Sequence, residues 1–260
     1  MSAHPRPTLT DVSALGVVLG IWAHPDDETL LSGGLMAAAR EAGQRVVCVT
    51  ATLGEQGTSD PLRWPPDRLR RVRRQELRAS LAALGVDEHI SLELPDGGCA
   101  LQPAEPIVDR LAGIIDTVRP DTIITFGPDG MTGHEDHQTV SRWTTEARER
   151  SRTTAQLLYA TTTEEFAVQW AEVAGDFPVF LADGLPLATP ASQLAFRMPL
   201  SAHLLDQKMV ALRAQATQMT PLLDALGEDL VRHYWSIETF VAADAHRTET
   251  AQWGTWRMAA

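Results

Sequence analysis

The chain has 260 residues, of which 44% are hydrophobic, and this is enough to bury one large core without disulfide staples. Its 34 acidic residues outnumber the 22 basic ones, and the resulting formal charge of −12 repels polyanions, so nucleic acid and anionic membranes are disfavoured as partners. The longest apolar run, around residues 14–23, is about half of the roughly 20 residues that a membrane-spanning helix needs.

The first residues and the two cysteines bear on the cellular compartment. The opening stretch, MSAHPRPTLTDVS, lacks the basic-then-apolar pattern of a signal peptide, so a cytoplasmic location is expected. Cys48 and Cys99 lie far apart and form no CxxC pair, which predicts two reduced, buried thiols and no thiolate metal site. The sequence leaves the oligomeric state open, with a homo-oligomer among the options.

Strand-like and helix-like segments alternate along the first 160 residues. The expected strands are Gly16–Trp22, Arg45–Thr50, Ile90–Leu94, Asp121–Phe126 and Gln156–Thr161. The expected helices run from Leu30 to Gly43, from Leu69 to Gly85, from Ile107 to Pro120 and from about His137 to Arg150. Such alternation predicts an α/β fold, with a mainly parallel β-sheet covered by helices on both faces.

The pattern loosens from about Glu164, where four prolines precede one expected helix around Ala202 to Gln218. We therefore expect a less regular C-terminal portion that packs beside the loops, and a surface tail in the last residues, AHRTETAQWGTWRMAA. We treat residues 1–260 as a single domain, with a core at about 14–162 and the C-terminal portion at about 163–260.

Charged and glycine-rich loops follow four of the expected strands. They are AHPDDE after the first strand, TLGEQG after the second, PDGG after the third and GPDGMTGHEDH after the fourth. In parallel sheets ligands bind beyond the carboxyl ends of the strands, because the loops converge there. We expect the side chains of these loops to form one site.

The first and fourth loops together favour a metal ion. Asp26, Asp27 and Glu28 alone could be acids that favour a helix N-terminus, and two histidines three residues apart often occur by chance. Both clusters at the ends of different strands are better explained by a divalent ion, which offsets carboxylate charge and binds neutral imidazole. Two imidazoles and one carboxylate leave coordination positions open, as catalysis requires.

Five motifs are spread over about residues 16–145, and they are AHPDDE, TLGE, RRQELRASLAALGV, PDG and GHEDH. Together they resemble the motifs of the PIG-L/LmbE-like zinc-dependent N-acetylglucosaminyl deacetylases. The resemblance implies a Rossmann-like fold and hydrolysis of an N-acyl group, typically acetyl on an N-acetylglucosaminyl conjugate. It also implies one zinc ion per chain, with Fe²⁺ or another divalent metal as an alternative. By matching position, the metal ligands would be His24, Asp27 and His137.

The same resemblance assigns the catalytic roles. Asp26 would be the general base, because a zinc ion lowers the pKa of its bound water to roughly 7 and a carboxylate can then remove the proton. His134 would stabilise the oxyanion or protonate the leaving amine, with Asp136 holding it oriented. Histidine suits that role because its charge changes near neutral pH.

Substrate contacts are implied for two further residues. The arginine and aspartate that match Arg73 and Asp96 contact sugar hydroxyls in sugar-binding members of the family. The alternatives are an intrahelical salt bridge between Arg73 and Glu76, which lie three residues apart, and a turn aspartate at position 96.

The sequence departs from the family at two positions. Thr132 stands where mycothiol-pathway relatives carry tyrosine, which weakens an assignment to that substrate. Lys208 fits a C-terminal family pattern, but Gln215 replaces its histidine, so a C-terminal contribution to the site is in doubt. Glu238 matches a recurring late glutamate of uncertain role.

The leading hypothesis is a zinc-dependent N-deacetylase that acts on an amino-sugar conjugate or a related small amide. One alternative is a metal-dependent amidase for a non-sugar natural product, and another is a non-catalytic small-molecule binding module. A binding module would not need a base and an acid beside the metal ligands. A dinucleotide-dependent enzyme is disfavoured, because no GxGxxG follows the first strand.

Overall fold

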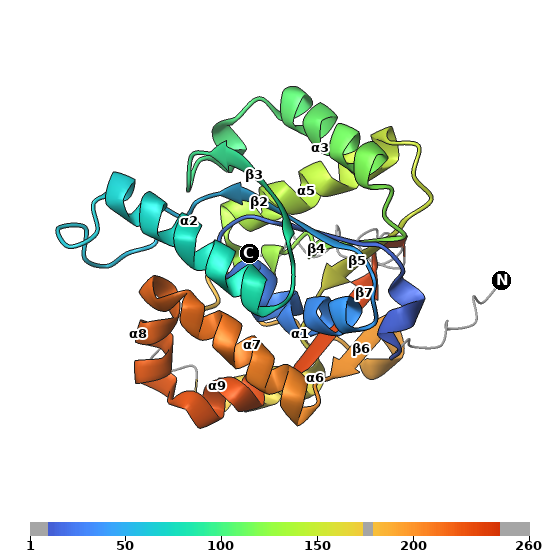
Figure 1. Cartoon of the computed structure of the whole chain (residues 1–260). Helices are drawn as coiled ribbons and strands as arrows, with labels where there is room; N and C mark the ends of the chain where they lie inside the picture. Colours follow the sequence, from blue (N-terminus) through green and yellow to red (C-terminus); the bar gives the residue numbers. More distant parts are fainter. Residues whose placement is uncertain (1–9, 174–178, 245–260) are drawn as a thin grey trace, which may run out of the picture.

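The computed structural model describes residues 10–173 and 179–244, so the surface tail expected at 245–260 lies outside the described residues. This part of the chain forms a seven-stranded sheet with the strand order β3-β2-β1-β4-β5-β7-β6 (Figure 1). The strands are β1 Val18–Trp22, β2 Val46–Thr52, β3 Glu88–Leu94, β4 Thr122–Phe126, β5 Gln156–Ala160, β6 Phe196–Pro199 and β7 Ile237–Ala242.

Helices connect the strands. The α-helices are α1 Asp27–Glu41, α2 Pro66–Ala83, α3 Ala104–Val118, α4 Gly130–Gly133, α5 Glu135–Arg150, α6 Glu164–Val173, α7 Ala202–Ala214, α8 Ala216–Leu226 and α9 Glu228–Tyr234. Short 3₁₀ helices lie at Val12–Leu15, Cys99–Leu101 and Ala191–Gln193. α3 and α5 pack together on one face of the sheet, and α1, α2 and α7 pack together on the other (Figure 1). The predicted α/β fold with helices on both faces is confirmed.

The centre of the sheet is apolar on both faces. Every residue of β1, β2 and β4 is buried, as expected for central parallel strands that are covered on both sides. Trp22 and Phe126 lie at the ends of neighbouring strands and meet edge to face, with ring centroids 5.0 Å apart. This contact packs the core directly beneath the loops that follow β1 and β4.

The C-terminal portion is more regular than the sequence pattern predicts. β7 lies antiparallel between β5 and β6, and neither β6 nor β7 is expected from the sequence. The single helix expected around Ala202 to Gln218 is two helices, α7 and α8, which are separated at Gln215. α7, α8 and α9 share a small core of Met209, Leu212, Met219, Leu222 and Val231. Both strands are short and mix polar with apolar residues, so their sequence periodicity is weak.

Cys48 and Cys99 are free, buried thiols, as expected. Within the described ranges no helix combines the length and the apolar character that crossing a membrane requires.

Candidate metal centre and catalytic site

The predicted site residues lie beyond the carboxyl ends of two neighbouring strands. β1 and β4 are adjacent, and the sheet continues from them to β2 and β3 on one side and to β5 on the other. In open α/β sheets a crevice forms where the strand order reverses in this way. His24 follows β1, while His134 and His137 follow β4, so two loops more than 100 residues apart meet there.

Donor atoms of three side chains from these loops face one another. His24 Nδ1 lies 3.0 Å from His137 Nε2 and 3.6 Å from Oδ2 of Asp27, and His137 Nε2 lies 3.4 Å from Oδ1 of Asp27. Ligand atoms held about 2.1 Å from a tetrahedral ion are about 3.4 Å apart. All three side chains are buried. The spacing and chemistry of this set therefore fit a divalent metal with room for a further ligand.

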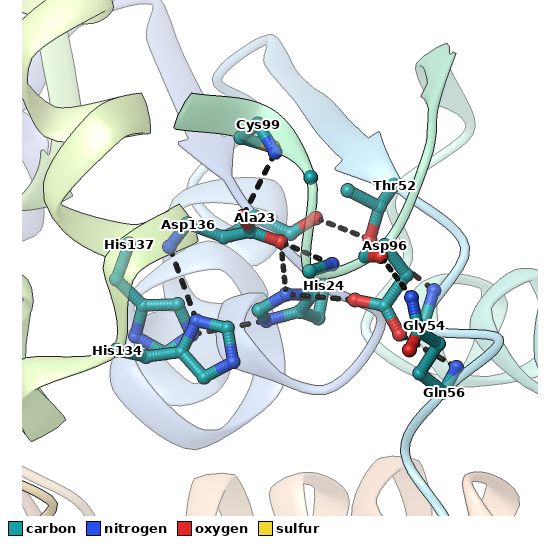
Figure 2. Close-up of polar contacts among 12 residues, drawn as sticks. Ala23, His24, Thr52, Gly54, Gln56, Asp96, Cys99, His134, Asp136 and His137 are labelled. Carbon is teal, nitrogen blue, oxygen red and sulfur yellow. Dashed lines mark hydrogen bonds and ion pairs between the residues drawn. The ribbon is translucent and has the colours of Figure 1, made fainter. Parts of the chain in front are cut away.

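The outer nitrogen of each imidazole has its own acceptor. His137 Nδ1 donates to the carbonyl oxygen of Gly130 at 2.9 Å, which leaves Nε2 unprotonated and facing the donor set. His24 Nε2 lies 3.1 Å from an Asp96 oxygen and 3.2 Å from an Asp136 oxygen (Figure 2). Burial favours a neutral His24 ring, but the hydrogen bonds that the ring donates to Asp136 and Asp96 outweigh burial and raise the pKa of His24 to about 10. The same carboxylates make His24 Nδ1 a stronger metal donor.

The position of Asp136 corrects one sequence expectation. Its carboxylate contacts His24 and accepts hydrogen bonds from the backbone N–H groups of Gly97 and Cys99 at 2.8 and 3.0 Å. His134 is held instead by the backbone of residue 136, whose N–H donates to His134 Nδ1 at 3.1 Å (Figure 2). The carboxylate of Asp136 therefore orients His24 rather than His134. Residue 136 thus contacts His24 through its carboxylate and His134 through its backbone N–H.

His134 is the N-cap of α5 and presents its other nitrogen away from the helix. Because Nδ1 accepts the backbone N–H of residue 136, the neutral ring carries its proton on Nε2. Burial and the nearby His24 lower the pKa of His134, which favours that neutral form. A neutral imidazole with a free Nε2–H is a hydrogen-bond donor toward developing negative charge.

Asp26 has an unusual backbone conformation next to the donor set. Its φ is +118°, outside the range that most non-glycine residues adopt, and its carboxylate does not cap α1. Instead Glu28 accepts the Asp26 N–H at 3.0 Å. Burial raises the pKa of Asp26 to about 7, while Arg73 acts in the opposite direction. This places the carboxylate in the pKa range that suits a general base near neutral pH.

Arg73 is buried and holds the Asp26 loop. Its guanidinium contacts the Asp26 carboxylate at 3.1 Å and donates to the carbonyl oxygens of Pro25 and Gly54. A Cβ at Gly54 would lie 2.0 Å from the guanidinium, so glycine permits this approach. The alternative pair with Glu76 does not form, because Glu76 accepts hydrogen bonds from Thr217. Arg73 thus connects the loops after β1 and β2.

We expect Arg73→Ala to lower thermal stability and kcat together. The substitution removes the hydrogen bonds from the guanidinium to the carbonyl oxygens of Pro25 and Gly54 and its contact with the half-buried Asp26 carboxylate, which frees the loop that carries Asp26. Thermal melting and steady-state kinetics measure both effects. Arg71→Ala, at an exposed position on the same helix, is the matched control and should change neither. A higher KM with an unchanged melting temperature would instead indicate a direct substrate contact.

Asp96 lies in the loop after β3 and faces His24 rather than open space. One carboxylate oxygen contacts His24 Nε2, and the other accepts the Gln56 N–H at 2.7 Å. Burial would raise the pKa of Asp96, but hydrogen bonding and charge from His24 outweigh it and lower the pKa to about 2. Asp96 also lines the cavity at the site.

Sequence reasoning missed a buried support behind Asp26. Glu28 is fully buried and accepts hydrogen bonds from the Asp26 N–H and from Gln215 Nε2, at 3.0 and 2.6 Å. Gln215, which replaces the family histidine, therefore reaches the site through Glu28. The position of Glu28 inside the AHPDDE motif was the sequence signal that could have indicated its role in supporting Asp26. Lys208 and Glu238 form a separate buried ion pair at 2.7 Å, and Glu238 also accepts two N–H groups of α1.

Two cavities adjoin the donor set, and both are lined by Asp27 and His137. The first, which we call the polar cavity, has a volume of about 390 Å³. Its described lining is His24, Asp26, Asp27, Gln56, Gly57, Arg73, Asp96, Gly97, His134, His137 and Gln218. The second, which we call the apolar cavity, has a volume of about 340 Å³ and lies toward α6, α9 and β7.

Comparisons with known proteins identify the family of the sequence. A family model described as "PIG-L: GlcNAc-PI de-N-acetylase" matches residues 19–148. A protein of Saccharomonospora viridis named 1D-myo-inositol 2-acetamido-2-deoxy-alpha-D-glucopyranoside deacetylase is 33% identical over 255 residues. That alignment covers 87% of this chain and 94% of the relative.

Solved structures of deacetylases share the fold. An N,N'-diacetylchitobiose deacetylase from Pyrococcus horikoshii superposes with a TM-score of 0.61 at 20% identity, covering 91% of this chain and 86% of the other. A triple mutant of a deacetylase from the teicoplanin biosynthetic pathway superposes with a TM-score of 0.63 at 20% identity, covering 87% of this chain and 97% of the other. At these identities the likeness concerns the fold alone.

Proposed function

The chain belongs to the PIG-L family of GlcNAc-PI de-N-acetylases, and from this membership we propose that it is a metal-dependent hydrolase that removes an N-acyl group, such as acetyl, from an amino-sugar conjugate. The observation that carries the proposal is the set of His24, Asp27 and His137 donor atoms, which lie 3.0 to 3.6 Å apart. A carboxylate on one side and an imidazole donor on the other complete the groups that amide hydrolysis needs.

The roles of the side chains follow from their positions. A metal held by His24, Asp27 and His137 would supply a Lewis acid that polarises the amide carbonyl and acidifies water. Asp26 takes the proton from the attacking water as the new C–O bond forms. His134 donates its Nε2–H toward the carbonyl oxygen as charge develops there.

Breakdown of the tetrahedral adduct completes the reaction. The C–N bond breaks, and the proton that Asp26 took from the water passes to the leaving nitrogen, so the products are a free amine and a carboxylic acid, which then ionises. Asp136 and Asp96 act on His24 by holding its Nε2–H, and Arg73 acts by positioning Asp26. Sugar hydroxyls would meet Asp96, Gln56 and Gln218 on the wall of the polar cavity.

We propose zinc as the metal, because two imidazoles and one carboxylate suit it, although Fe²⁺ binds the same ligand set. We also propose that the protein is located in the cytoplasm, and the two free thiols support this location. We also propose that residues 1–260 form one domain, since β6 and β7 extend the same sheet as β1.

The relatives guide the choice of substrate. Their names specify an N-acetylglucosaminyl group on inositol and N,N'-diacetylchitobiose, both of which are amino-sugar conjugates. Thr132 departs from the tyrosine of mycothiol-pathway members, so we do not assign this chain to that pathway. We propose an amino-sugar amide as the substrate class, with a non-sugar amide as the competing candidate.

Acetate release from a panel of N-acetylglucosaminyl conjugates tests the proposal. We expect turnover by protein that contains about one divalent ion per chain, loss of turnover after chelation, and recovery when Zn²⁺ or Fe²⁺ is added back. Elemental analysis of protein purified without added metal gives the stoichiometry. Full activity in protein that contains no metal would refute the hydrolase mechanism.

A further inference from the structure

The apolar cavity has a built wall of aromatic rings. Phe166 and Tyr234 line it with ring centroids 5.7 Å apart, and Trp170 stands behind them, 5.2 Å from Tyr234 and 5.8 Å from Phe166. Trp235 also lines the cavity, and its ring lies 6.2 Å from that of Trp170. Rings that pack against one another in this way hold their positions, so the cavity does not depend on a ligand to form.

The opposite wall belongs to the metal centre. Asp27 and His137 border the apolar cavity together with Leu30 and Leu31 of α1. Glu238 lies on the same wall, but its carboxylate is engaged by Lys208 and by two backbone N–H groups of α1. The lining also holds polar groups, among them Glu165, Arg197 and five threonines, but the leucines of α1 and the aromatic rings give the cavity an extended hydrocarbon surface that favours an apolar ligand group.

The positions of Asp26 and His134 indicate which part of the substrate enters this cavity. Both line the polar cavity and are absent from the described lining of the apolar one. The leaving nitrogen must face the polar cavity, because Asp26 carries the proton that this nitrogen receives. The two substituents of the amide carbonyl diverge from its carbon, so the acyl substituent points to the other side of Asp27 and His137.

The volume of the apolar cavity exceeds what acetyl requires. A water molecule occupies about 30 Å³ in the liquid, and a methyl group is of similar size. A cavity of about 340 Å³ is roughly ten times that size. An acetyl methyl group would leave most of the aromatic wall without a partner, whereas an acyl chain of roughly six to ten carbons would cover it.

We propose that the apolar cavity binds the acyl group of the substrate and that the protein is an N-deacylase for medium-length acyl amides. This inference rests on the proposed hydrolase function and specifies its acyl group. Water adds to the carbonyl carbon, its proton passes through Asp26 to the nitrogen, and the C–N bond breaks to give the amine and a medium-chain carboxylic acid.

Two methyl 2-acylamido-2-deoxyglucosides that differ only in the acyl group test the inference in the metal-loaded protein. We expect kcat/KM for the N-octanoyl compound to exceed that for the N-acetyl compound at least tenfold, because the added methylenes leave water. Cleavage of the N-acetyl compound alone would overturn the acyl-chain site and leave the proposed hydrolase standing.

Ile237 offers a way to narrow the cavity. It lines the cavity, and the residue is 38% exposed, so Ile237→Trp adds bulk without disturbing the core. We expect the ratio of octanoyl to acetyl kcat/KM to fall at least tenfold in this variant. Leu230→Trp is the matched control, since Leu230 is 37% exposed and outside the described lining. Equal ratios in the two variants would contradict the inference.

Calorimetric titration with sodium octanoate and sodium acetate separates this inference from the hydrolase proposal. Octanoate should bind at least tenfold more tightly than acetate to wild-type protein, and the difference should shrink in Ile237→Trp. Octanoate binding without turnover of either glucoside would refute the proposed hydrolase function but would still support an acyl-chain site in the apolar cavity. Equal affinity for the two carboxylates would refute the chain site, including in a protein that hydrolyses the N-acetyl compound.

Discussion

Asp26→Asn should slow amide hydrolysis by about 10² to 10⁴-fold, the usual contribution of a general base, while the metal stays bound. Asparagine keeps the shape of the side chain and removes its basicity. It also tolerates the positive φ of residue 26 better than most residues, so the loop should keep its conformation. The change also leaves the buried Arg73 guanidinium without the carboxylate that it contacts at 3.1 Å, so thermal melting measured beside the kinetics separates lost catalysis from lost stability.

Asp27→Asn is the matched comparison, because it makes the same chemical change one residue away. Asp27 supplies an oxygen 3.4 Å from His137 Nε2, so its asparagine variant should weaken metal binding by at least 10 to 100-fold. Elemental analysis after dialysis, together with kinetics, measures both variants. If Asp26→Asn lost the metal and Asp27→Asn kept it, the two assignments would have to be exchanged.

The pH profile gives the Asp26 variant a second readout. A general base works when it is deprotonated, so kcat/KM should fall as pH drops below the pKa of Asp26. That pKa is about 7, and a bound cation next to it would lower it, which places the acidic limb of the loaded enzyme below pH 7. This limb should disappear or move in Asp26→Asn.

His134→Ala should reduce kcat by roughly two to three orders of magnitude, as expected for loss of a donor to a developing oxyanion, and should leave the metal content unchanged. The metal measurement is necessary because ring nitrogens of His24, His134 and His137 lie within 4.8 Å of one another. A variant that lost the metal would make His134 a ligand and contradict the role proposed for it.

A second substitution separates catalysis from helix capping at the same residue. His134 Nδ1 caps α5, so His134→Ala should also lose about 1 kcal/mol of stability. Asparagine is a favoured N-cap, and His134→Asn should keep that stability while losing the Nε2–H that reaches the polar cavity. Equal losses of rate with unequal melting temperatures would support the proposed role. Normal turnover in His134→Asn would show that His134 only caps α5 and takes no part in catalysis.

The predictable part of the site lies within single loops. AHPDDE and GHEDH each place their charged residues at the end of a strand, and the structure brings His24, Asp27 and His137 together there. The roles of Asp136 and Arg73 depended on contacts across the fold. The Asp136 carboxylate turns to His24, and Arg73 pairs with Asp26 instead of Glu76.

The sequence by itself determined the α/β alternation, the residues at the carboxyl ends of β1 and β4, and the imidazole and carboxylate groups of the donor set. These features are local, because the spacing of apolar residues and the composition of a loop can each be recognised within about ten residues of sequence. Only the tertiary structure decided that β6 and β7 complete the sheet, that Gln215 supports Glu28, and that an aromatic cavity adjoins Asp27 and His137. Each of these joins segments far apart in the chain, where the path of the backbone and the direction of each side chain select one partner among several of the same chemistry.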